Sequence, residues 1–156
     1  MVDAYLDGLR MLARRELSTA QVRARLTRKG HAADAIDAAV RTLTDERALD
    51  DARVAAAIAR TESGVMGRGR LRVRRRIEAA GIAPDVAAHA LETVFADVDA
   101  HALLDAALRR RLRGDRPIAD DRERQRLYRY LVGQGFEPDR VIAALRARRM
   151  PAAGLE

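Results

Sequence analysis

The chain has 156 residues, a net charge of +7, few aromatic residues and no cysteine. The absence of cysteine excludes disulfide bonds and thiolate metal sites. No apolar run is long enough to cross a membrane, and the N-terminus lacks the basic-then-apolar layout of a signal peptide. We therefore expect a cytoplasmic protein without a membrane partner, and its richness in alanine and leucine favours helix throughout.

Apolar residues recur at helical spacing along the chain, which predicts nine helices. The first spans about 3–14 and turns Tyr5, Leu6, Leu9 and Leu12 inward. Ser18 and Gln21 form a capping box for the second, which ends at Lys29. The remaining helices are expected at 33–46, 51–63, 68–80, 84–96, 98–112, 121–133 and 138–149. We also expect a flexible loop around 63–67 and a polar connector at 113–117.

Three diverged copies of one unit underlie these helices. Gly30, Gly81 and Gly135 are 51 and 54 residues apart, and an aspartate stands four residues after each. The positions four and eight residues before each glycine are apolar and share one helix face. Each glycine suits a left-handed helix C-cap, and each aspartate complements the dipole of the next helix. The sequence therefore predicts an all-α fold of three tandem three-helix repeats in an elongated, curved arrangement. The expected repeats are 1–49, 50–96 and 97–150, followed by a loose tail at 151–156.

Arginines form a repeated pattern on two of the predicted helices. In 68–80, Arg68, Arg72 and Arg75 share a face opposite Val73 and Ile77. Arg70, Arg74 and Arg76 flank this face, and Arg122, Arg126 and Arg129 occupy the same register in 121–133. These nine arginines are the predicted site for an acidic partner or DNA. An ordinary solvated helix face is the alternative interpretation. The first repeat lacks the pattern and is nearly neutral, since residues 1–50 carry nine cations and eight anions.

Other candidate sites have simpler explanations. The pairs Asp50–Asp51 and Asp120–Asp121 precede helices, where N-capping is the expected role. His31, His89 and His101 are too scattered to form a set of metal ligands. The segment 67–70 is glycine-rich but follows no strand and lacks the lysine of a P-loop. We therefore expect no catalytic site, no cofactor and no metal.

Several short motifs occur in a characteristic order. Leu49-Asp50-Asp51 opens a helix, Arg60 and Gly67 follow, and a basic helix ends in Ala80-Gly81-Ile82. The segments 14–18 and 29–30 precede them. Over about residues 4–149 the chain resembles the RecX family, bacterial regulators of the recombinase RecA. The resemblance implies three tandem three-helix repeats and binding to RecA and to its filament on single-stranded DNA. It also implies limits on filament growth, strand exchange and coprotease activity, in DNA repair and the SOS response.

Combining the resemblance with the arginine pattern gives one hypothesis for function. A monomeric, non-enzymatic inhibitor would lie in the groove of the RecA filament. Its arginines would meet acidic RecA surface or the phosphates of single- or double-stranded DNA. Two alternatives stay open. A stand-alone DNA-binding helical module would bind duplex DNA sequence-specifically at two-fold half-sites. A helical scaffold with an incidental basic surface would have no DNA affinity.

Overall fold

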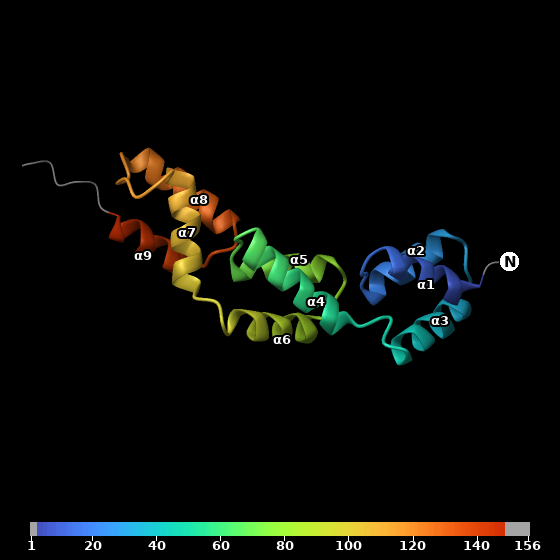
Figure 1. The fold of residues 1–156 in the computed structure, drawn as a ribbon. Coiled ribbons are helices and arrows are strands. Elements are labelled where there is room, and N and C mark those ends of the chain that lie inside the picture. Colours follow the sequence, from blue (N-terminus) through green and yellow to red (C-terminus); the bar gives the residue numbers. More distant parts are fainter. Residues whose placement is uncertain (1–2, 149–156) are drawn as a thin grey trace, which may run out of the picture. The chain divides into compact units, whose positions relative to one another are not determined.

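The computed structural model describes residues 3–148, and its nine α-helices confirm the predicted all-α fold class (Figure 1). In chain order they are α1 (Ala4–Arg14), α2 (Thr19–Arg28), α3 (Ala33–Asp45), α4 (Asp51–Arg60), α5 (Arg70–Ala79), α6 (Pro84–Phe95), α7 (Ala100–Leu112), α8 (Asp121–Gly133) and α9 (Pro138–Ala147). Between residues 3 and 148, no helix is long and apolar enough to cross a membrane. The predicted tail, 151–156, lies outside the described residues.

The helix ends follow the punctuation of the sequence. Gly30, Gly81 and Gly135 have φ values of +91°, +77° and +98°, in the left-handed region that glycine adopts at a helix C-terminus. The N–H of each glycine donates a hydrogen bond to the carbonyl oxygen three residues earlier. The predicted capping box is also present, because Ser18 Oγ accepts from the Gln21 N–H and Gln21 Oε1 accepts from the Ser18 N–H. These features were predictable because each depends on local backbone chemistry.

Asp50 and Asp120 cap the helices that follow them, as predicted. Asp120 Oδ1 accepts a hydrogen bond from the Glu123 N–H at 2.8 Å, at the start of α8. Asp50 Oδ1 accepts from the Arg53 N–H at 3.1 Å, at the start of α4. Asp51 Oδ1 instead accepts from both the backbone N–H and the hydroxyl of Thr19, the first residue of α2. Asp50, Asp51 and Asp120 thus accept hydrogen bonds within the protein, and Asp121 forms an ion pair with Arg124 at 3.7 Å.

The contacts of the described residues divide into two compact units. The first contains the residues up to Ile58 together with Arg76–Ala90. Within it, α1 packs against α2 and α3, and α2 packs against α3 (Figure 1). The buried residues of this trio are Ala4, Leu17, Val22, Leu26, Ile36, Ala39, Val40, Leu43 and Leu49. The core is therefore built from the apolar face of each helix.

The buried face of α1 differs from the predicted one. Leu6 and Leu9 are 44% and 39% exposed, so their predicted inward orientation is wrong. Ala4 and Gly8 are buried instead. A Cβ atom on Gly8 would lie 2.8 Å from Leu43 Cδ1 of α3. The small residues of α1 therefore face α3 because they allow the two helices to approach closely.

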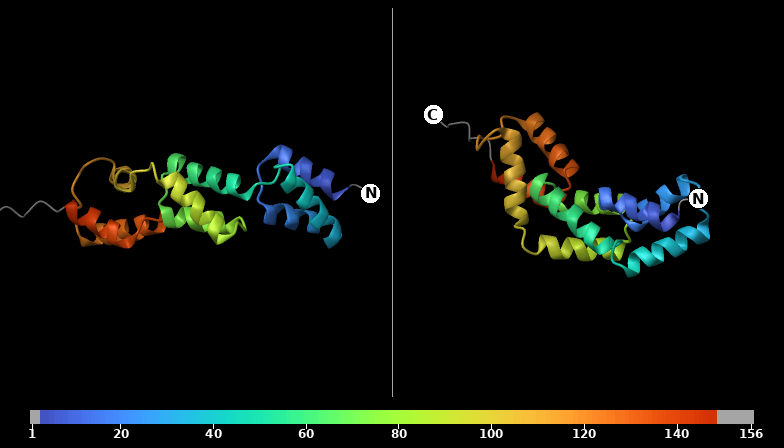
Figure 2. Two further views of the ribbon diagram at one scale, coloured as in Figure 1. Left: turned by 90° about the horizontal axis from the view of Figure 1, so that it is seen from below. Right: turned by 45° about the vertical axis from the view of Figure 1, so that its right-hand side comes forward.

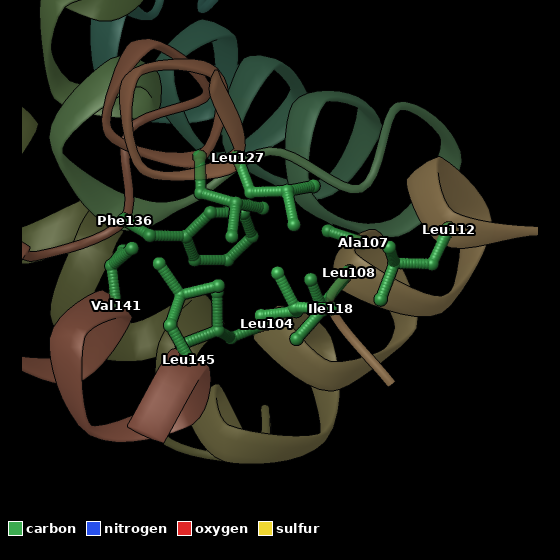
Figure 3. Packing of buried hydrophobic residues seen from close by; sticks show 10 residues of the cluster. Leu104, Ala107, Leu108, Leu112, Ile118, Leu127, Phe136, Val141 and Leu145 are labelled. Atoms are coloured by element: carbon green, nitrogen blue, oxygen red, sulfur yellow. The ribbon is translucent and has the colours of Figure 1, made fainter. Parts of the chain in front are cut away.

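The second unit contains Ala59–Arg75 and the described residues from Leu91 onward. Within it, α7 packs against α8 and α9, and α8 packs against α9 (Figure 2). Figure 3 shows side chains from these three helices, with Ile118 and Phe136 from the connecting segments, converging on one core. Phe136 directly follows the C-cap glycine of α8 and is 6% exposed. This glycine therefore turns the chain so that the next side chain enters the core.

The segment between α4 and α5 is more regular than predicted. The expected helix 51–63 ends as an α-helix at Arg60 and continues as a π-helical turn, Thr61–Val65. Ser63 is buried within the expected loop, and its hydroxyl donates to the Ala59 carbonyl oxygen at 2.6 Å. The expected helix 68–80 begins two residues later, at Arg70. Arg68 therefore belongs to the connection before α5 and not to the helix.

Candidate partner-binding surface

The N-terminus of α5 is fixed on the C-terminal end of α8. The backbone N–H of Gly69 donates to the Gln134 carbonyl oxygen at 2.9 Å, and that of Leu71 donates to the Gly135 carbonyl oxygen at 3.0 Å. A Cβ atom on Gly69 would lie 2.5 Å from the carbonyl carbon of Gly135. Glycine at position 69 thus allows free N–H groups of one helix to satisfy free carbonyl groups of another. This junction determines where the following arginines begin.

Arg68 is held within the protein surface. Its guanidinium pairs with the Glu62 carboxylate at 2.6 Å, and the two side chains are 22% and 12% exposed. Its backbone N–H donates to the carbonyl oxygen of the same glutamate at 2.9 Å. The predicted face of Arg68, Arg72 and Arg75 on one helix is therefore wrong at its first member. Arg68 links the π-helical turn to the start of α5.

Two arginines in the first turn of α5 have contacts within the second unit. The guanidinium of Arg70 lies over the Phe95 ring, 5.9 Å from its centroid. Arg72 Nη1 donates to the Gly133 carbonyl oxygen at 3.3 Å. Both side chains are half-buried. These contacts hold the two side chains near the junction and reduce the number of donors left for a partner.

The later arginines of α5 face solvent. Val73 and Ile77 are fully buried, as predicted, while Arg74, Arg75 and Arg76 are exposed. Within residues 3–148, neither Arg74 nor Arg75 has a hydrogen bond or ion pair from its guanidinium. These two charges have no internal carboxylate to offset them. They are therefore available to an external anion.

The predicted arginines of α8 lie opposite its buried stripe. Leu127 and Leu131 are buried, and Arg122, Arg126 and Arg129 are exposed. In the described part of the chain, none of these three guanidiniums is joined to a carboxylate. The sequence pattern therefore located three outward cations on this helix, none of them bound by a carboxylate of the described residues.

Glu123, the acidic residue between Arg122 and Arg126 in the sequence, already binds other groups of the protein. The guanidinium of Arg116 binds Glu123 in a fork, with Nη2 2.5 Å from Oε1 and Nη1 3.1 Å from Oε2. Glu123 Oε2 also accepts the Ala119 N–H at 2.7 Å. The bond from Arg116, followed by that from Ala119, lowers the pKa of Glu123 to about 2. The carboxylate stays ionised and fixes the connector before α8.

A groove between α8 and α9 adds residues that the sequence pattern missed. It has a volume of about 440 Å³ and joins the exposed Arg129 to an apolar floor that includes Tyr128, Ile142 and Leu145. Ile142 is 37% exposed, and Arg124 and Arg146 also line the groove. Arg124 Nε is buried without a hydrogen-bond partner among the described residues. The outward isoleucine on an otherwise polar face of α9 was the one sequence signal for this groove.

The histidines do not form a metal site. Nε2 of His31 lies 2.8 Å from Oδ2 of Asp7, so this histidine bonds a buried carboxylate of α1. No group of three or more metal-binding side chains occurs within residues 3–148.

Comparisons with known proteins converge on one family. Residues 4–43 match the family model of the RecX first three-helix domain, and residues 97–145 match that of the RecX third three-helix domain. Regulatory protein RecX of Chromohalobacter salexigens is 36% identical over 139 residues, which cover 89% of this chain and 88% of the relative. Regulatory protein RecX of Halorhodospira halophila is 34% identical over 140 residues, covering 90% and 84%.

Two solved structures share the fold. A crystal structure of regulatory protein RecX matches with a TM-score of 0.75 and 21% identity, covering 92% of this chain and 70% of the other. The crystal structure of RecX from Lactobacillus salivarius matches with a TM-score of 0.72 and 20% identity, covering 92% and 95%. At this level of identity, the structures are evidence for the all-helical fold alone.

Proposed function

The chain belongs to the RecX family, and from this premise we propose that it is a non-enzymatic regulator of RecA. It binds the RecA filament on single-stranded DNA and limits filament growth, and so depresses strand exchange and coprotease activity. These effects place it in the cytoplasm, in DNA repair and the SOS response. Family membership is the observation that carries this proposal, and the exposed arginines of α5 and α8 support it.

The proposed contact surface consists of five exposed guanidinium groups that no carboxylate of the described residues binds. Arg74 and Arg75 lie on α5, and Arg122, Arg126 and Arg129 lie on α8. A planar guanidinium can bind a carboxylate through two parallel hydrogen bonds, so acidic RecA surface is a suitable partner. The adjacent α8–α9 groove offers an apolar floor on which a partner side chain can be buried. Arg68, Arg70 and Arg72 position the surface, because internal contacts hold their side chains.

The proposal is tested by RecA ATP hydrolysis on single-stranded DNA, with this protein titrated from substoichiometric ratios. Strong inhibition well below one molecule per RecA would indicate that it blocks filament ends or disrupts the filament. Inhibition only near saturation would indicate that it coats the filament groove or competes for DNA. Absence of any effect on a cognate RecA would overturn the proposal.

A charge-reversal pair tests the contact surface itself. Arg126→Glu with Arg129→Glu should raise the concentration needed for half-inhibition by at least about tenfold, because tenfold corresponds to about 1.4 kcal/mol and like charges at an interface cost more than that. The matched control is Arg41→Glu with Arg47→Glu, which removes the same charge from exposed positions at α3 and the residues after it. Equal losses in both pairs would mean that only total charge matters, and would remove α8 from the proposal.

A stand-alone DNA-binding module is the second candidate, because outward arginines without carboxylate partners also suit phosphates. It predicts sequence-specific duplex binding in the absence of RecA. Titration of labelled duplexes of different sequence, without RecA, separates the two candidates. A helical scaffold with an incidental basic surface would give neither duplex binding nor inhibition of RecA.

A further inference from the structure

A basic groove lies between α1 and α2, in the repeat whose total charge is nearly zero. Its volume is about 790 Å³. Six cations line it: Arg10, Arg14, Arg15, Arg25, Arg28 and Lys29. They are two thirds of the nine cations in residues 1–50, and Asp7 is the only anion among the described residues of the lining. The fold therefore separates charges that are mixed along the sequence.

The single carboxylate of the groove is neutralised from within the protein. Asp7 Oδ2 lies 2.8 Å from His31 Nε2, and Asp7 Oδ1 lies 3.2 Å from Lys29 Nζ and 3.9 Å from Arg10 Nη1. The hydrogen bond to His31, assisted by Lys29, holds the pKa of this carboxyl below its usual value. Asp7 is also 5% exposed, so it presents little negative charge to solvent.

The other arginines of the groove have no such partner. Within residues 3–148, the guanidiniums of Arg14, Arg15, Arg25 and Arg28 form no hydrogen bond or ion pair. Other arginines of the same unit do pair, and Arg23 binds Asp37 at 2.6 Å. The carboxylate of Asp37 thus pairs with an arginine that lies outside the groove. Four like charges brought together without compensation raise the energy of the folded state unless an anion binds them.

We propose that the α1–α2 groove binds the phosphate backbone of a nucleic acid, as a site separate from the α5 and α8 surface. The density of negative charge favours this ligand. One nucleic-acid strand carries a charge every ~3.4 Å, whereas an extended peptide advances ~3.3–3.6 Å per residue and turns alternate side chains away, so that even an all-acidic peptide presents one charge per ~7 Å on one face. An acidic peptide would also need apolar anchors, and Met11 is the one apolar side chain among the described residues of the lining. Without an aromatic residue among them, the lining residues contact phosphates and not stacked bases.

The test is fluorescence anisotropy of a labelled thymidine 30-mer with the full chain and no RecA. Arg14→Ala with Arg28→Ala should weaken binding about 25-fold at 0.1 M salt, because each lost phosphate contact removes a counterion-release factor of about 5. The slope of log affinity against log salt should fall by about 1.4. Both side chains are exposed and unpaired among the described residues, so the helices should remain folded, and circular dichroism verifies this.

The control pair Arg41→Ala with Arg47→Ala removes the same charge elsewhere in the first unit and should change affinity less than threefold. An equal loss of affinity in both pairs, or no binding by the unaltered chain, would overturn the proposal that this groove binds nucleic acid. Polyglutamate that displaces the 30-mer at equal charge concentration would assign the groove to an acidic protein and overturn the nucleic-acid proposal. Because RecA is absent, the outcome does not depend on whether the RecA proposal succeeds.

Discussion

The junction between α5 and α8 predicts a large effect of one methyl group. Replacement of Gly69 with alanine would place a Cβ atom 2.5 Å from the Gly135 carbonyl carbon and 2.6 Å from the Phe136 nitrogen. Ordinary contact between carbon atoms requires about 3.5 Å, so the start of α5 must move by about 1 Å. Both neighbours are backbone atoms, which cannot rotate away as a flexible side chain can.

The expected cost follows from the contacts that this movement breaks. A shift of about 1 Å lengthens the hydrogen bonds from Gly69 and Leu71 beyond useful range, at about 1 kcal/mol each. Residual overpacking adds about 1–3 kcal/mol. Reduced flexibility of the unfolded chain returns about 0.4–1 kcal/mol. The net loss of unfolding free energy is therefore about 3 kcal/mol, which lowers Tm by about 9 °C in a chain of this size.

Thermal unfolding followed by circular dichroism measures this shift. Gly64→Ala is the matched control, because no atom lies within 4 Å of a Cβ atom built there. Its effect should stay within about 0.5 kcal/mol. A Gly69→Ala protein with an unchanged Tm would show that α5 and α8 do not approach as closely as described, and would refute the reasoning about the junction.

Two further changes test the internal contacts. Ser18→Ala removes a helix cap and a buried hydrogen bond to the Ala80 carbonyl oxygen, so urea unfolding should show a loss of about 2 kcal/mol. Thr42→Ala, whose hydroxyl bonds only within α3, should cost less than about 0.5 kcal/mol. For Glu123, the pKa is lowered from 4.5 to about 2, so its stabilising effect is complete above pH 4.5 and disappears as the pH falls towards 2. Glu123→Gln should therefore flatten the dependence of Tm on pH across that range, and an unchanged slope would contradict this.

The sequence predicted those parts of the fold that depend on local chemistry. The C-cap glycines, the Ser18 capping box and the Asp50 and Asp120 caps are each determined by residues within one turn of one another. The buried stripe of α5 followed from helical periodicity in the same way. Such features need no knowledge of which other helix lies nearby.

The errors arose where a distant residue decides the outcome. Leu6 and Leu9 on α1 are exposed because Gly8 allows Leu43 of α3 to approach the opposite side of the helix. The hydrophobicity of the α1 sequence cannot predict this contact with another helix. Helical periodicity places Arg68 on a helix face, but Glu62 in the π-helical turn holds it before the helix begins. The charge of the first repeat looked balanced because a sum along the sequence cannot show which charges lie around one groove.

Residues at equivalent positions of the three repeats make different contacts. Ser18 and Gly69 both stand twelve residues before a C-cap glycine, and both are buried at the start of a second helix. Ser18 uses its hydroxyl to bond the Ala80 carbonyl oxygen, whereas Gly69 uses its backbone N–H to bond Gln134 and leaves no space for a side chain. Glu123 holds the same position in the third repeat and binds Arg116 instead. The repeat thus conserves the place of each helix end, while the contact made there depends on what that end meets.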